Sequence, residues 1–255
     1  MSDGYEGKID LDYRAKTVLD IVMAERPVLL NQRYDRGTNI PLKFWRQQAH
    51  FTTPASGTPE KAIRGMESVA KLLHRFSLTP EEIAGRTGAP LQSLQEVLNG
   101  SKHTPFVMVD CEDAVALTPE ASERARRGAL RCFTQEDWGS TLPFFRPAGL
   151  LLDTCAEDLV TVLCNAAERP AKDSHPVAGI VWPKIEYPEE MKWVCEILTR
   201  VEEDMAMDTN ELKLEFLVES GNSLLHLREI IEVAGQRLVG IIWGIADYSA
   251  DINLP

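Results

Sequence analysis

The sequence has few cysteines, no long apolar run and a shortage of basic residues. Its five cysteines are scattered, odd in number and never spaced as C-x-x-C, so we expect reduced thiols rather than a disulfide framework or a cysteine zinc site. No stretch approaches the roughly 18 apolar residues of a membrane span, and the polar N-terminus lacks the apolar segment of a signal peptide. These absences predict a cytoplasmic protein with no membrane partner.

The chain is strongly acidic. Lys and Arg together number 27 against 39 Asp and Glu, which gives a formal net charge of −12. A phosphate backbone repels such a chain unless a local basic patch is present. The chain contains a segment at residues 91–98 that resembles a recognition helix, but this segment has no Lys or Arg. Nucleic acid is therefore not expected as a partner.

Short apolar runs of β type alternate with helical segments along the 255 residues. Several runs are apolar on consecutive residues, as expected for parallel strands that are covered on both faces. Proline followed by acidic residues opens the helical segments near 59, 119 and 188. This alternation predicts an α/β fold of right-handed βαβ units, a TIM-type (β/α) barrel formed by a single domain over 1–255. The expected strands are 50–54, 106–110, 142–146, 178–184, 214–219 and 238–244.

Two stretches interrupt the alternation. Residues 1–49 form an N-terminal extension, with one expected helix at 14–25 and an irregular stretch at 31–44. Residues 77–104 form a polar insertion with the pattern of two short helices around Gly88. We interpret this insertion as a small helical hairpin on the rim of the barrel.

Charged residues gather where the expected strands end. Charges placed at random along buried strands would be costly, whereas charges at the carboxyl ends of barrel strands are typical of an active face. The sequence therefore predicts a functional site there. The residues concerned are Asp110, Glu112, Asp113, Arg146, Lys184, Glu219 and Asp247.

The types of these residues indicate a chemistry. Glu219 and Asp247 are hard oxygen donors that suit Mg²⁺, and no His or Cys accompanies them, so zinc is not expected. Arg146 offers a planar fork to a substrate carboxylate or carbonyl. For Lys184 we favour an ion pair over a Schiff-base nucleophile, because neighbouring carboxylates keep a lysine pKa high.

The acidic cluster after the second run allows more than one role. Asp110, Glu112 and Asp113 are candidates to hold metal-bound waters, or to orient Arg146 or Lys184. Other nucleophile systems have little support, since Gly-x-Ser-x-Gly is absent and the five histidines have no fixed relation to a Ser or Cys. We interpret Ser56-Gly57 as a plain turn rather than a phosphate site, and His50 as a core or surface histidine.

Five segments in order resemble the HpcH/HpaI aldolase and citrate lyase β-subunit family, which includes malyl-CoA lyases. The resemblance extends over about residues 48–255, with 77–104 as an insertion. The segments are VDCEDAVAL (109–117), FFRP (144–147), VWPKIEYPEE (181–190), FLVESGNSL (216–224) and IIWGIADYSADI (241–252).

The resemblance implies a Mg²⁺-dependent carbon–carbon lyase or aldolase. Its substrate would be a small hydroxy- or oxo-carboxylate, or the CoA thioester of one, reacting through a metal-stabilised enolate. Glu219 and Asp247 would hold the metal, Arg146 would grip the oxoacid end, and Gly244 would line the substrate site. Glu112 and Asp113 would assist catalysis close to the metal. The resemblance also implies a homo-oligomer, a trimer or hexamer.

The chain departs from the family pattern in two places. Arg146-Pro147-Ala148 stands where the family usually has Arg-x-Asn, which removes a polar contact near the substrate. Family members also continue through two further strands and a C-terminal lid, whereas six strands are expected here. We therefore expect a barrel that is incomplete at the C-terminus. The alternatives are that residues 1–49 or a partner chain complete it, or that the barrel is open.

The sequence leaves two other functions open. One is a thioester hydrolase that uses the same metal site. The other is a catalytically degenerate barrel that serves as a subunit or scaffold, with 77–104 as its docking element. The response to magnesium distinguishes an intact metal site from a scaffold, because a bound ligand raises thermal stability by mass action.

Overall fold

The structure, a computed structural model, describes most of residues 40–254. The described ranges are 40–45, 47–57, 79–88, 90–92, 95, 104–113, 115–116, 118–139, 141–168 and 175–254, with Lys16, Leu19, Asp20, Met23, Ala24 and Pro27 before them. The chain divides into two units, Met1–Asn39 and Ile40–Pro255, and the sheet belongs to the second. Most of the helix expected at 14–25, the helix expected after Pro59 and much of the stretch at 91–98 lie outside the described residues.

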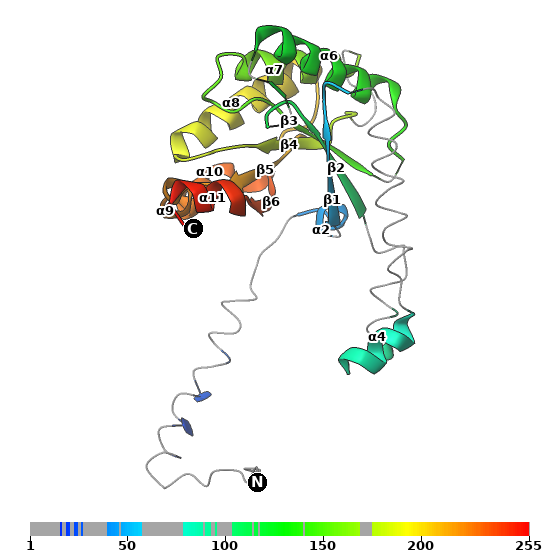
Figure 1. Ribbon diagram of the computed structural model, residues 1–255, viewed down its shortest axis with the longest axis vertical. Helices are drawn as coiled ribbons and strands as arrows, with labels where there is room; N and C mark the ends of the chain where they lie inside the picture. Colours follow the sequence, from blue (N-terminus) through cyan, green and yellow to red (C-terminus); the bar gives the residue numbers. More distant parts are fainter. Residues whose placement is uncertain are drawn as a thin grey trace. The chain divides into compact units, whose positions relative to one another are not determined.

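Six strands form one parallel sheet whose order in space is their order along the chain (Figure 1). Helices alternate with the strands, as the sequence predicts for a (β/α) barrel. The strands are β1 (Gln47–Pro54), β2 (Thr104–Asp110), β3 (Leu142–Arg146), β4 (Gly179–Trp182), β5 (Lys213–Val218) and β6 (Leu238–Trp243). The helices are α2 (Leu42–Trp45), α4 (Pro80–Thr87), α6 (Pro119–Gln135), α7 (Cys155–Asn165), α8 (Pro188–Met205), α9 (Gly221–Leu225), α10 (Leu227–Ala234), η2 (Gly235–Arg237) and α11 (Ile245–Asp251).

Local sequence explains where the helices begin. Thr118 caps α6 by accepting a hydrogen bond from the Ala121 N–H, and Pro119 stands in its first turn. In the insertion, Thr79 and Glu82 form a reciprocal capping box that opens α4, and the helix ends at Gly88, whose φ of 69° is in the left-handed region. The first helix of the predicted hairpin is therefore present.

The structure differs from the predicted elements at α2, at the start of β1 and at the end of β4. A short helix, α2, overlaps the end of the stretch 31–44 that we expected to be irregular, because its Phe44 packs into the barrel interior. Strand β1 begins at Gln47, ahead of the apolar run, because pairing with β2 extends it backwards. Strand β4 stops at Trp182, two residues early, because Lys184 has a φ of 48° that an extended strand does not permit.

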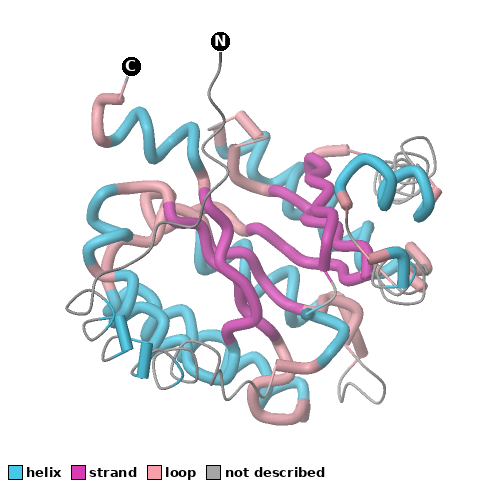
Figure 2. The backbone as a smooth tube through the Cα atoms, turned by 90° about the horizontal axis from the view of Figure 1, so that it is seen from below, coloured by secondary structure: helices cyan, strands magenta, loops and turns pink. Residues whose placement is uncertain are grey.

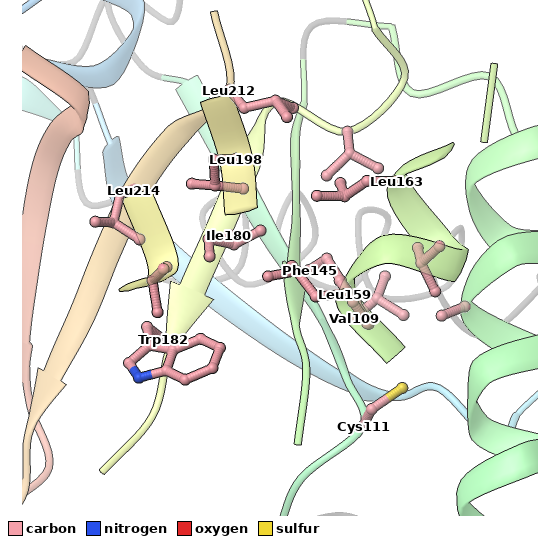
Figure 3. Close-up of a cluster of buried hydrophobic side chains, with 14 of the residues drawn as sticks. Val109, Cys111, Phe145, Leu159, Leu163, Ile180, Trp182, Leu198, Leu212 and Leu214 are labelled. Atoms are coloured by element: carbon pink, nitrogen blue, oxygen red, sulfur yellow. The ribbon is translucent and has the colours of Figure 1, made fainter. Parts of the chain in front are cut away.

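The buried residues form two layers, one on each face of the sheet. Alternate strand residues pack outward against α6, α7 and α8, and Figure 3 shows part of this layer, with Val109, Phe145 and Ile180 among side chains from the helices. The opposite face holds a smaller cluster of Phe44, Phe106, Met108, Leu142, Phe144, Val181 and Leu217. Figure 2 shows the strands as a twisted layer with helices around it. The strand sequences are apolar on consecutive residues because both faces of the sheet are covered.

Close packing of α6 requires a glycine. A Cβ on Gly128 would overlap the carbonyl oxygen of Ala55, which follows β1. The helix therefore lies directly against the end of the first strand. Small residues continue on this buried side of α6, at Ala121, Ala125 and Ala129.

The described sheet is an incomplete barrel with β1 and β6 at its edges. Ile241 and Trp243 on β6 are 42% and 47% exposed, unlike the strand residues of β3, β4 and β5, which are almost all buried. Helix α2 packs against β6, so it occupies part of the space between the two edges. In the part of the chain that the structure describes, no helix is long and apolar enough to cross a membrane.

A carboxyl group lies inside the barrel half, on the inner face of β5. Glu215 is 1% exposed, and its Oε1 accepts a hydrogen bond of 2.9 Å from the Gln47 amide on β1. Gly240 of the neighbouring strand leaves room for it, because a Cβ there would lie 2.7 Å from Oε1. Burial raises the pKa of Glu215 to about 7, with a smaller opposing effect from Gln47.

The raised pKa predicts a pH-dependent stability that Glu215→Gln removes. The folded carboxyl holds its proton up to about pH 7, whereas the unfolded one loses it near 4.5. The free energy of unfolding is therefore expected to fall between pH 4.5 and 7, by about 3 kcal/mol from this group. Urea unfolding at pH 5 and pH 8 measures the fall, which we expect to be smaller in the Gln variant. An equal fall in wild type and variant would contradict the assignment, and the exposed Glu203→Gln is the control.

Candidate active site

The parallel sheet brings the carboxyl ends of its strands to one edge, and the predicted site residues follow these ends. Asp110 and Arg146 are the last residues of β2 and β3. Lys184 comes two residues after β4, and Glu219 directly after β5. Gly244 follows β6 directly, and Asp247 stands in the first turn of α11. Residues up to 137 positions apart in the sequence therefore meet in one place, as predicted.

Arg146 is held by Asp110 in a two-pronged contact. The Nε and Nη2 groups each donate to one Asp110 oxygen at 2.7 Å, and both side chains are buried. Asp110 also accepts the Glu112 N–H at 2.9 Å. Burial alone would lower the pKa of Arg146, but the hydrogen bond and charge of Asp110 raise it above its usual range. Of the roles considered for Asp110, the geometry supports orienting Arg146.

The third nitrogen of the Arg146 guanidinium, Nη1, faces two acids in the loop after β2. Its Nη1 lies 3.2 Å from Glu112 Oε2 and 3.4 Å from Asp113 Oδ2. Burial raises the pKa of Glu112 to about 7 in spite of Lys184 and Arg146. For the more exposed Asp113, burial has the same raising effect, but the Lys184 hydrogen bond and the Arg146 charge together lower its pKa. The two acids therefore differ in proton affinity although they are adjacent.

Lys184 forms the ion pairs that the sequence predicts. Its Nζ donates to Glu112, donates to Asp113 at 3.0 Å and lies 3.3 Å from Asp247. Burial alone would lower the lysine pKa, but these hydrogen bonds and charges raise it above its usual range. A Schiff-base nucleophile needs a neutral amine, so this environment disfavours that role.

Three carboxylates come together beside Lys184. Asp113, Glu219 and Asp247 each offer an oxygen, and these oxygens lie within 4.8 Å of one another. Glu219 is buried, which raises its pKa, and its Oε2 accepts the Lys184 N–H at 3.0 Å. An all-oxygen set on three separate segments fits Mg²⁺, which takes one or more carboxylates and keeps several waters. Among the described residues at this cluster, no His or Cys contributes a ligand atom.

The sequence does not predict Asp113 as a member of this group of carboxylates. The sequence predicts that Asp113, like Glu112, lies close to the metal, where it holds metal-bound waters or orients Arg146 or Lys184, with Glu219 and Asp247 as the ligands. The structure directs Glu112 toward Arg146 and Lys184 and brings Asp113 to Glu219 and Asp247. In the Asp-x-Glu-Asp pattern no signal separates these two roles, because the backbone after a strand no longer alternates regularly.

Gly244 lies against the Glu219 side chain. A Cβ at this position would lie 2.8 Å from Glu219 Oε1 and still closer to its Cγ. The φ of Gly244 is −83°, so its conformation is open to other residues and the need for glycine comes from space alone. Its expected contact with substrate stays a prediction, whereas its contact with Glu219 explains why a side chain is excluded.

Gly244→Ala is therefore expected to displace the Glu219 carboxylate and weaken metal binding. The new methyl group needs the volume that Glu219 Cγ and Oε1 fill, so the carboxylate has to rotate or β6 has to shift. Displacing a ligand in this way is expected to lower Mg²⁺ affinity by about 10- to 100-fold. Calorimetric titration with Mg²⁺ measures this, with Gly85→Ala, in open space within α4, as a comparison for stability. Unchanged affinity in Gly244→Ala would contradict the tight contact.

Two further features considered in the sequence are His50 and the turn at Ser56-Gly57. His50 stands four positions before the end of β1, and its ring stacks on Phe106 with centroids 4.1 Å apart. Ser56 and Gly57 form a turn in which the Gly57 N–H donates to the Pro54 carbonyl at 3.1 Å. Both observations agree with the structural roles we favoured.

A family model matches the part of the chain that contains the strand-end motifs. The family model described as HpcH/HpaI aldolase/citrate lyase matches residues 100–255, which include β2 to β6 and every residue of the site. The chain belongs to this family. The resemblance in the five motifs is thereby confirmed.

Curated proteins with similar sequences include malyl-CoA lyases. L-malyl-CoA/beta-methylmalyl-CoA lyase of Cereibacter sphaeroides strain ATCC 17025 is 27% identical over 148 residues, 58% of this chain and 43% of that protein. The protein of the same name from strain ATCC 17029 is 26% identical over the same shares. The chain thus spans less than half the length of the curated relatives it matches.

Solved structures of Haloferax volcanii malate synthase share the fold. The lead(II) complex superposes with a TM-score of 0.54 at 16% identity, over 81% of this chain and 52% of that one. The ternary complex with pyruvate and acetyl-CoA gives 0.50 at 19% identity, over 59% and 42%. These similarities confirm the TIM-type barrel arrangement of the sheet.

Proposed function

We propose that this protein is a Mg²⁺-dependent carbon–carbon lyase or aldolase. Its substrate is a small hydroxy- or oxo-carboxylate, or the CoA thioester of one. The observation that carries the proposal is the meeting of Asp113, Glu219 and Asp247 within 4.8 Å, next to the Arg146 guanidinium, whose Nε and Nη2 groups are held by Asp110. Membership of the family and the names of the similar lyases support the reaction type.

Asp113, Glu219 and Asp247 would hold the metal. When bound, Mg²⁺ supplies a Lewis acid that polarises the oxo group of the substrate. The protein's own groups do the remaining work. Arg146, whose rotation Asp110 prevents, presents a fixed positive charge beside the place where negative charge develops when the carbon–carbon bond breaks. Because this cation is already oriented, it stabilises an enolate without reorganisation.

Glu112 is the group best suited to move a proton. Its pKa of about 7 means that it exchanges a proton near neutral pH, and it lies between Arg146 and Lys184. Arg146 and Lys184 both have pKa values above their usual range and keep their protons. We therefore assign Glu112 as acid–base group, Arg146 to substrate binding and Lys184 to charge balance. Gly244 keeps its predicted place at the substrate site.

The test is a panel of small acids assayed with and without Mg²⁺. Glyoxylate, pyruvate and oxaloacetate are each incubated with acetyl-CoA, and condensation products and free thiol are measured separately. The proposal expects Mg²⁺-dependent formation or cleavage of a carbon–carbon bond with at least one acid. Thiol release without any bond formation would indicate the thioester hydrolase instead. Absence of both reactions, together with no rise in Tm on adding Mg²⁺, would indicate the scaffold.

The proposal includes assembly and location as expectations from the family resemblance. We expect a cytoplasmic homo-oligomer, a trimer or a hexamer. Light scattering of the purified protein measures the assembly, and a monomer at micromolar concentration would contradict it.

A further inference from the structure

Lys184 touches every carboxylate of the candidate metal site, some through its side chain and one through its backbone. Its ammonium lies 3.0 Å from Asp113 Oδ1 and 3.3 Å from Asp247 Oδ2. Its backbone N–H donates to Glu219 Oε2 at 3.0 Å. The side chain also pairs with Glu112, which is not one of the three grouped carboxylates. One residue thus connects the metal site with the acid–base group.

The backbone of Lys184 is in an unusual conformation for a residue with a side chain. Its φ is 48°, in the left-handed region, which costs about 1 kcal/mol or more outside glycine. This conformation ends β4 and turns the N–H of Lys184 toward Glu219. The backbone geometry therefore fixes a metal-site carboxylate independently of the lysine side chain.

The Lys184 side chain, in contrast to its backbone N–H, opposes metal binding. An ammonium in contact with Asp113 and Asp247 neutralises the oxygens that a divalent cation needs. Two cations cannot share the same oxygens closely, because their repulsion at a few ångströms is large in a partly buried site. The Lys184 side chain is 34% exposed, and Glu112 offers it a separate partner. The ammonium is therefore able to leave Asp113 and Asp247 while it keeps the Glu112 contact.

We propose that Lys184 is a positioning residue that sets the metal affinity of this site in two opposing ways. Its backbone N–H holds Glu219 in place, and its ammonium competes with the divalent cation for Asp113 and Asp247. Metal binding is then an exchange of cations, in which Nζ leaves these two carboxylates and stays on Glu112. This inference rests on the proposed metal site and adds a residue that tunes it.

The test is calorimetric titration of the purified protein with Mg²⁺ alone, at low ionic strength and fixed pH. Lys184→Met keeps the backbone N–H and removes the competing charge, so we expect it to bind Mg²⁺ at least about 10-fold more tightly than wild type. Lys184→Arg restores a cation and is expected to return the affinity toward the wild-type value. Lys192→Met, on the exposed side of α8, is the matched control and is expected to change nothing.

A second variant covers the case in which Lys184→Met does not fold. Asn tolerates the left-handed region, so Lys184→Asn is expected to fold, as a thermal melt shows, and to bind Mg²⁺ more tightly as well. Equal or weaker binding by the folded variants, with normal binding by wild type, would overturn the role of Lys184 alone. No Mg²⁺ binding by wild type or by any Lys184 variant would overturn the metal site itself, and the role of Lys184 with it.

Discussion

Replacing Glu219 by Gln is expected to lower Mg²⁺ affinity by about 100-fold or more, and metal-dependent turnover with it. Glu219 is the most buried of the three grouped carboxylates, and a hard divalent cation depends on the negative charge of its ligands. Altering residues that only support metal ligands already costs about 10- to 100-fold in affinity. Losing a ligand is expected to cost at least as much.

The fold of Glu219→Gln is expected to stay intact. Burial already raises the pKa of Glu219, which means that its environment disfavours the charged form. A neutral amide of the same shape still accepts the Lys184 N–H. Loss of Mg²⁺ binding without loss of Tm would therefore report on the site and not on folding.

Calorimetric titration with Mg²⁺ and a thermal melt check this prediction together. Asp247→Asn is expected to have the same effect, since Asp247 belongs to the same group of carboxylates. Glu203→Gln, exposed on α8, is the matched control and is expected to bind as wild type does. If both Glu219→Gln and Asp247→Asn kept full affinity, the metal assignment would be wrong.

Replacing Arg146 by Lys is expected to lower kcat by about 10²- to 10³-fold. The substitution keeps the positive charge and loses the planar fork, so the two parallel contacts with Asp110 cannot both form. The remaining ammonium is free to rotate and no longer presents a fixed donor to the substrate. The loss is expected in kcat more than in stability, because Asp110 keeps a cationic partner.

Arg146→Met separates the catalytic role from the structural one. It removes the charged group that pairs with buried Asp110 through two hydrogen bonds, which is expected to cost roughly 3–5 kcal/mol in the free energy of unfolding. Urea unfolding measures this cost, and steady-state kinetics measures the effect of the Lys variant. Arg127→Lys, on the exposed side of α6, is the control for both. Unchanged kinetics in Arg146→Lys would remove Arg146 from the active site.

Much of the fold was readable from the sequence because its strands are buried on both faces. The runs around Phe145 and Ile180 are consecutively apolar, and the structure packs alternate residues of each run against helices or into the barrel interior. The polar boundaries were harder to predict. Gln47 extends β1 only because it pairs with Thr104 and reaches Glu215, two contacts over more than 50 positions that no local pattern shows.

The candidate site was readable for a related reason. In a parallel sheet all carboxyl ends share one edge, so Arg146, Glu219 and Asp247 were expected together once the strands were recognised. Glu215 was missed, although a carboxylate in the middle of the apolar run 214–219 was a usable signal. Its position on the inner face, beside Gly240, depends on the register between β5 and β6.

The sequence by itself determined which acids, which arginine and which lysine follow the strands, and in which order. It also indicated the family that these residues resemble. Only the tertiary structure decided which of these side chains contact one another. In the structure Asp113 lies near Glu219 and Asp247, Asp110 pairs with Arg146, and Lys184 lies among the carboxylates. The reason is physical, because residue types and spacing specify what a side chain can do. Which partner it meets depends on loop conformation and on packing between distant strands.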